Sequence, residues 1–231
     1  LLTLATLALA WRVGRRFAGG WVAALVVYAL FIGTPLLFYS SIEPLNSHSP
    51  GAFAAAVFVF FLLRCTTSLR PAYRPDQRED YAPRTFDWIV LGISAGVTIL
   101  VRWQLALVVI PAWALLLYEA FAEPLVERRR WRGFFISAAA AAITLLPLPL
   151  IWQQMFGAPF VIPYNEASGG SFLRSENEAL KVIEQTLLTS PLVALIFPGL
   201  FLLARRVPLW ALLLAALVFG QWIINGAALD W

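Results

Sequence analysis

The chain has 231 residues, of which 61% are hydrophobic and 13% are charged, and its mean hydropathy is +0.77. This balance excludes a water-soluble globular domain, in which about 25% of residues are charged. The net charge of +4 does not indicate a nucleic-acid partner, because the basic residues sit between apolar stretches and not in one patch. The single cysteine, Cys65, excludes an internal disulfide.

Long apolar runs recur along the whole chain. A helix needs about 20 apolar residues to cross about 30 Å of hydrocarbon. In chain order the runs cover residues 1–11, 21–40, 50–69, 86–101, 103–121, 133–152, 187–204 and 208–226, the first of them truncated and 86–101 short. The sequence therefore predicts an all-α fold, a polytopic transmembrane helical bundle of about seven to eight membrane segments that forms one domain over 1–231.

The basic residues are distributed unequally between alternate connections. Lys and Arg accumulate in short cytoplasmic loops, and one alternate set of connections holds 14 of the 17: Arg12, Arg15, Arg16, Arg64, Arg70, Arg74, Arg78, Arg84, Arg128, Arg129, Arg130, Arg132, Arg205 and Arg206. The other set holds Arg102, Arg174 and Lys181. This asymmetry predicts cytoplasmic loops at 65–86 and 122–132. It predicts extracytoplasmic loops at 41–49, near residue 102 and at 153–186.

Local signals predict two helix starts. Ser49-Pro50 offers an N-cap hydroxyl followed by proline at the first helical position. Ser175 with Glu178 matches a capping box, and apolar residues then recur on one face, which predicts a short amphipathic helix over 175–188 at the outer interface. The run Arg128-Arg129-Arg130 is interpreted as a cluster that sets topology and contacts lipid headgroups.

Two polar positions near the outer ends of the apolar runs are candidate site residues. Glu43 and His48, the only histidine, can serve as base, ligand or phosphate contact; the alternative is that both are ordinary solvated side chains. Arg102 interrupts the apolar stretch 86–121, and its guanidinium geometry suits phosphate oxygens. The alternative for Arg102 is a cation that snorkels to the headgroups at a helix end.

The long outer loop 153–186 supplies two further candidates, Tyr164 and Arg174, which can close over a substrate at the membrane surface. The alternative is that Arg174 is solvated or paired with Glu178. The sequence contains no Walker-type glycine loop, GxGxxG, HExxH or cysteine pair, and a lone histidine makes no zinc site. We therefore predict no metal site and no cofactor.

Several short segments resemble one membrane enzyme superfamily. They are Thr34-Pro35-Leu36-Leu37-Phe38-Tyr39, Glu43-Pro44-Leu45, Ser47-His48, Phe53, Leu91 to Gly96 leading to Val101-Arg102, the Pro147 and Pro149 helix end with Phe156-Gly157-Ala158-Pro159, and Trp222 to Trp231. In these the chain resembles bacterial GT-C superfamily membrane glycosyltransferases, similar to the family 39 protein mannosyltransferases and the aminoarabinose transferases of lipid A. The resemblance covers most of the chain as a pattern of helices and short motifs.

The resemblance implies transfer of a sugar from a polyprenyl-phosphate donor to an acceptor (lipid, glycan or protein) on the outer face of the bacterial inner membrane. An acidic residue acts as base in that superfamily, and cations stabilise the phosphate leaving group. In that superfamily the carboxylate lies in the first outer loop near the N-terminus, so the resemblance implies a position upstream of Leu1. Because the chain also begins without Met inside an apolar run, we expect a fragment that is inactive alone. The alternatives are a transporter or flippase for a lipid or small solute, and a structural membrane subunit.

Overall fold

The computed structural model describes residues 1–42, 48–66, 82–122, 127–160, 177–205 and 207–227. Within these ranges the chain is helical and contains no strand, as the sequence predicts. The elements are α1 (Leu2–Gly14), α2 (Gly20–Ile32), α3 (Leu36–Ser41), α4 (His48–Cys65), α5 (Thr85–Val101), η2 (Trp103–Leu105), α6 (Ala106–Ala122), α7 (Glu127–Leu145), α8 (Pro147–Phe156), α10 (Asn177–Thr189), η3 (Pro191–Leu195), α11 (Ile196–Ala204) and α12 (Pro208–Ala227).

In the part of the chain that the structure describes, three helices are long and apolar enough to cross a bilayer. They cover His48–Cys65, Trp103–Phe121 and Arg130–Phe156. Five shorter apolar helices accompany them, at Leu2–Gly14, Gly20–Ile32, Thr85–Val101, Val193–Ala204 and Pro208–Gly220. Many large apolar side chains are exposed, including Trp21, Ile110 and Phe201, as expected where helices face lipid instead of water. The fold is that of a helical membrane protein.

Small residues allow helices α5 and α7 to approach closely. A Cβ added at Gly92 would lie 2.2 Å from the backbone oxygen of Ser137, and one at Gly96 would lie 2.6 Å from Thr144 Cβ. Glycines spaced four residues apart on one helix face are a common packing device between membrane helices. The buried core extends from this seam across α4, α6 and α12, with Phe58, Leu91, Val109, Ala141 and Trp210 among its members.

Two predicted spans are interrupted at prolines. The run 21–40 divides into α2 and α3 because Pro35 has no N–H to continue the helix. Next to it, the hydroxyl of Thr34 donates to Leu30 O at 2.6 Å. The run 187–204 divides at Ser190, where η3 begins with Pro191. Helix α10 confirms the helix predicted over 175–188, of which residues 175 and 176 lie outside the described ranges. Helix α4 starts at His48, close to the predicted Ser49-Pro50 start.

The predicted loops differ from the observed connections at their edges. The outer loop predicted over 153–186 contains the end of α8 and most of α10. The cytoplasmic loop predicted over 122–132 contains the first residues of α7, and the one over 65–86 ends where α5 begins. Hydropathy places these boundaries poorly, because charged and amphipathic turns remain helical beyond the apolar core of a run.

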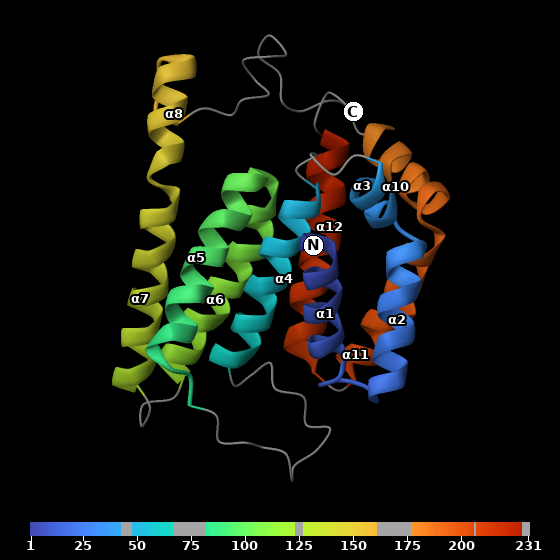
Figure 1. Ribbon diagram of the computed structural model, residues 1–231, viewed down its shortest axis with the longest axis horizontal. Coiled ribbons are helices and arrows are strands. Elements are labelled where there is room, and N and C mark those ends of the chain that lie inside the picture. The colour runs from blue at the N-terminus through green and yellow to red at the C-terminus, as the bar shows by residue number, and fades with distance from the viewer. Residues whose placement is uncertain (43–47, 67–81, 123–126, 161–176, 206, 228–231) are drawn as a thin grey trace.

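The bundle has two chemically different ends. Figure 1 shows one end, at the bottom of the view, where α1 joins α2, α4 ends, α5 begins, α6 leads to α7 and α11 leads to α12. These segments carry Arg12, Arg15, Arg16, Arg64, Arg84, Arg130, Arg132 and Arg205, and we call this the arginine-rich end. The opposite end holds α3, the start of α4, the end of α5, the end of α8 and α10.

Candidate functional site

Two predicted site residues meet at the end of the bundle opposite the arginine-rich end. His48 opens α4 and Arg102 follows α5, and Arg102 Nη1 lies 2.7 Å from His48 Nδ1. A guanidinium can only donate hydrogen bonds, so His48 Nδ1 is the acceptor and the neutral ring carries its proton on Nε2. Both groups carry further N–H donors, the remaining guanidinium N–H groups and the imidazole Nε2–H, and donors of this kind suit an anion.

Tyr39 completes the cluster from α3. Its ring stacks on the His48 imidazole with centroids 3.9 Å apart and planes inclined by 17°. The hydroxyl of the buried Ser49 donates to the backbone oxygen of Tyr39 at 3.3 Å, which links the end of α3 to the start of α4. The stacking and this hydrogen bond hold the imidazole ring in one orientation. We call Tyr39, His48 and Arg102 the outer cluster.

The backbone around Arg102 explains why its side chain is available at this end. Arg102 is extended (φ −149°, ψ 107°), so α5 ends there and η2 starts at the next residue. Arg102 is the C-cap residue of α5, a position at which cationic residues are favoured. A Cβ at Gly51 would lie 3.5 Å from Val101 Cγ1 and 3.8 Å from Arg102 Cδ. The aliphatic part of Arg102 therefore passes close to α4 at Gly51.

The other predicted site residues, Glu43, Tyr164 and Arg174, lie outside the described ranges. Their roles stay predictions. Among the described residues no group of three or more His, Cys, Asp or Glu side chains could hold a metal ion. In the described part of the site the chemistry is a guanidinium, an imidazole and a phenol, which together can bind an anion and stack on an apolar or planar group.

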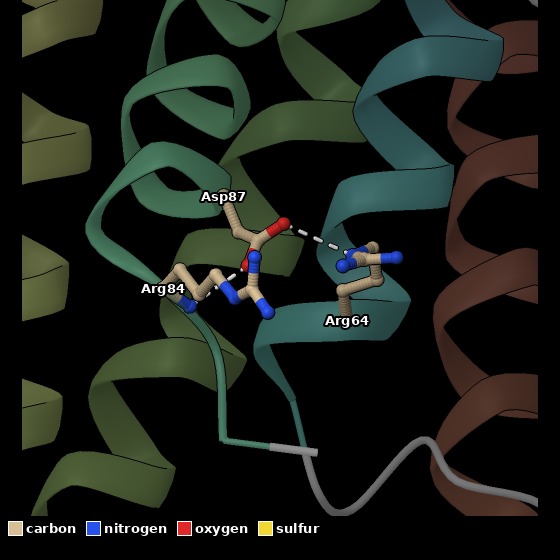
Figure 2. Close-up of polar contacts among 3 residues, drawn as sticks. All are labelled: Arg64, Arg84 and Asp87. Carbon is tan, nitrogen blue, oxygen red and sulfur yellow. Dashed lines mark hydrogen bonds and ion pairs between the residues drawn. The ribbon is translucent and has the colours of Figure 1, made fainter.

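A second polar group lies at the arginine-rich end and was not predicted. Asp87 is 2% exposed and accepts hydrogen bonds from Arg64 Nε at 3.0 Å and from the backbone N–H of Arg84 at 2.8 Å (Figure 2). The second bond closes the first turn of α5, as an acidic residue at the third helical position does. The first bond joins α5 to the end of α4. Asp87 therefore serves as a structural link between the two helices.

A second buried ion pair repeats this arrangement between α6 and α7. Glu119 is 2% exposed and accepts a hydrogen bond from Arg130 Nη1. The interpretation of Arg130 as a headgroup contact is therefore wrong, because its side chain is turned into the protein toward a buried carboxylate. A signal was present in the sequence: Asp87 and Glu119 lie inside apolar runs, where an ionisable residue requires a partner.

The fold defines a class, a helical membrane protein, and its described residues bring a guanidinium, an imidazole and a phenol together at one end of the bundle. Beyond that class, no family model, no curated protein and no solved structure matches the chain.

Proposed function

We propose that the protein is part of a multi-pass glycosyltransferase of the bacterial inner membrane, with seven to eight membrane segments. It moves a sugar from a polyprenyl-phosphate-linked donor to a lipid, glycan or protein acceptor on the extracytoplasmic face. The observation that carries the proposal is the contact between Arg102 and His48. The donor's phosphate is the anion that this pair binds. The resemblance to GT-C glycosyltransferases is the reason for proposing that the group transferred is a sugar.

The position of the outer cluster supports a lipid-linked substrate. A polyprenyl phosphate enters from the bilayer with its phosphate at headgroup depth, so its binding groups belong at the ends of membrane helices. His48 begins a helix long enough to cross the membrane, and Arg102 directly precedes another, Trp103–Phe121. A guanidinium there stabilises the negative charge that develops on the phosphate as the sugar leaves.

The charge distribution supports the orientation. The basic residues gather at the end opposite the outer cluster, and such residues favour the cytoplasmic side. The outer cluster then faces the extracytoplasmic side, where polyprenyl-linked sugars are used by enzymes of the resembled superfamily. The predicted contacts from Glu43, Tyr164 and Arg174 belong to segments that the sequence places on the same side.

The transporter alternative has less support from the ionisable residues. Coupled transporters place polar sites near the bilayer midplane, often at broken helices. The buried carboxylates described here, Asp87 and Glu119, instead lie near helix ends and are each paired with arginine. Transport is therefore the alternative that the experiments below distinguish from sugar transfer.

The experiment measures binding of radiolabelled undecaprenyl phosphate to the purified protein in detergent. Replacing Arg102 with Gln removes a charged donor, and we expect affinity to fall by about 10- to 100-fold, the usual range for hydrogen bonds to charged groups. Arg132→Gln removes an exposed arginine at the other end and serves as the matched control. Equal binding by wild type and Arg102→Gln would remove Arg102 from the phosphate site.

Sugar transfer is tested separately, in membranes that contain the full-length gene product and a labelled polyprenyl-phosphate sugar. We expect Arg102→Gln to abolish turnover while the protein keeps its helical content. Phosphate binding without any transfer of sugar would favour a flippase or transporter over an enzyme.

A further inference from the structure

An apolar groove lies between α1 and α2, away from the outer cluster. It has a volume of about 370 Å³ and is lined by Leu7, Ala8, Trp11, Ala24, Val27, Tyr28 and Phe31. The lining residues of each helix recur at spacings of three and four, so each helix contributes one continuous face. Figure 1 shows the two helices side by side, joined at the arginine-rich end. The groove is in the size range of pockets that hold a small ligand.

The groove ends at exposed positive charge. The guanidinium of Arg15 lies over the Trp11 ring, 4.7 Å from its centroid, and the Trp11 indole N–H donates to Gly20 O at 3.1 Å. Arg15 follows Trp11 by four residues and continues the same helix face. The side chains of Arg12 and Arg15 are exposed. One residue, Trp11, thus lines the groove, supports the cation at its rim and anchors the turn to α2.

The surroundings favour an anion at this rim. Helices α1, α2, α4 and α12 contain no Asp or Glu. Helix α2 begins without a side-chain cap, so its first N–H groups add to the positive field. A Cβ added at Gly19 or Gly20 would meet no heavy atom within 4 Å, so there is open space beside those amides.

We infer that the α1–α2 groove is a binding site for an anionic phospholipid, with an acyl chain along the groove and the phosphate at Arg12 and Arg15. The apolar groove together with the two arginines at its rim selects this occupant. An apolar helix from a second copy would fill the groove but would leave the arginines unmatched, whereas a phospholipid satisfies both features at the depth where headgroups lie. The inference is independent of the glycosyltransferase proposal, because the site lies at the opposite end of the bundle and shares no residue with the outer cluster.

The test measures retention of spin-labelled phosphatidylglycerol and phosphatidylcholine by the purified full chain in detergent. We expect wild type to retain phosphatidylglycerol preferentially. Replacing Arg12 and Arg15 together with Gln should reduce that preference by about 30-fold, since each basic residue near a lipid surface contributes about a fivefold factor. Arg132→Gln, at the same end but outside the groove, should keep the preference. Equal retention of both lipids by wild type, or an unchanged preference in the double variant, would overturn the inference.

A second variant tests the groove itself. Ala24→Phe fills the space between the helices and should reduce retention of both lipids, while Arg12 and Arg15 remain. Arg12→Lys with Arg15→Lys keeps the charges and should keep the preference, which distinguishes a charge effect from a folding defect. Unchanged retention in Ala24→Phe, or a dimer in light scattering that excludes lipid from the wild-type groove, would show that no acyl chain occupies the groove.

Discussion

The buried carboxylate of Glu119 faces the guanidinium of Arg130 between α6 and α7. Removing one of these two residues should affect stability differently from removing both. Taking two charges out of water is unfavourable, and their attraction offsets that loss only while both remain. Removal of one partner leaves an unmatched charge in an apolar surrounding. Removal of both leaves a space that apolar side chains can fill.

We therefore predict that Arg130→Ala lowers the free energy of unfolding by about 3–5 kcal/mol, the usual effect of breaking a buried pair from one side. The double replacement Glu119→Leu with Arg130→Met should recover most of that loss. Thermal unfolding in detergent, followed by circular dichroism, measures both. A double variant less stable than Arg130→Ala would show that the pair contributes more than mutual neutralisation.

Residue types could be read from the sequence at this scale, but their pairing could not. Arg102 and His48 were each identified as polar positions near the outer ends of apolar runs, and the structure brings them within 2.7 Å. The contact depends on how α4 and α5 are placed along one another, which periodicity within either helix does not determine. The same reason explains why Asp87 was missed as the partner of Arg64.

At the scale of elements, helices α5 and α7 pack closely because glycines, which have no side chain, stand at the contact between them. Gly92 and Gly96 face Ser137 and Thr144 so closely that any Cβ requires the helices to separate. Within lipid, close van der Waals packing replaces the hydrophobic effect as a source of helix association. Loss of this approach therefore removes contacts along the whole seam.

We predict that Gly92→Ala lowers the unfolding midpoint, because overpacking of a tight interface costs about 1–3 kcal/mol. Gly199→Ala is the matched control. Its Cβ meets nothing within 4 Å in α11, and alanine favours a helix over glycine by about 1 kcal/mol, so this variant should be neutral or stabilising. Scanning fluorimetry in one detergent compares the two. The same sign of effect at both positions would show that helix propensity, not the seam, decides the result.

Helix identity could be predicted from hydropathy where one apolar run forms one helix. The run 86–101 corresponds to α5 (Thr85–Val101), and 208–226 corresponds to α12 (Pro208–Ala227). The prediction was wrong where a proline divides a run, because an average over apolar side chains carries no information about a missing backbone N–H. The break between α2 and α3 places Tyr39 on a separate short helix, where its ring stacks on His48.

At the scale of the whole molecule, the separation of charge between the two ends predicts an orientation that can be measured. Ser41 lies at the end of α3, beside the outer cluster, and Ala82 lies just before α5 at the arginine-rich end; both are exposed. If basic residues hold their end in the cytoplasm, Ser41→Cys should react with a membrane-impermeant maleimide in intact cells. Ala82→Cys should react only after permeabilisation.

The native Cys65 is buried, so the unmodified protein gives the background signal. The reverse labelling pattern would place the outer cluster in the cytoplasm, where an extracytoplasmic sugar donor cannot reach it, and would contradict the proposed function even if Arg102 binds phosphate.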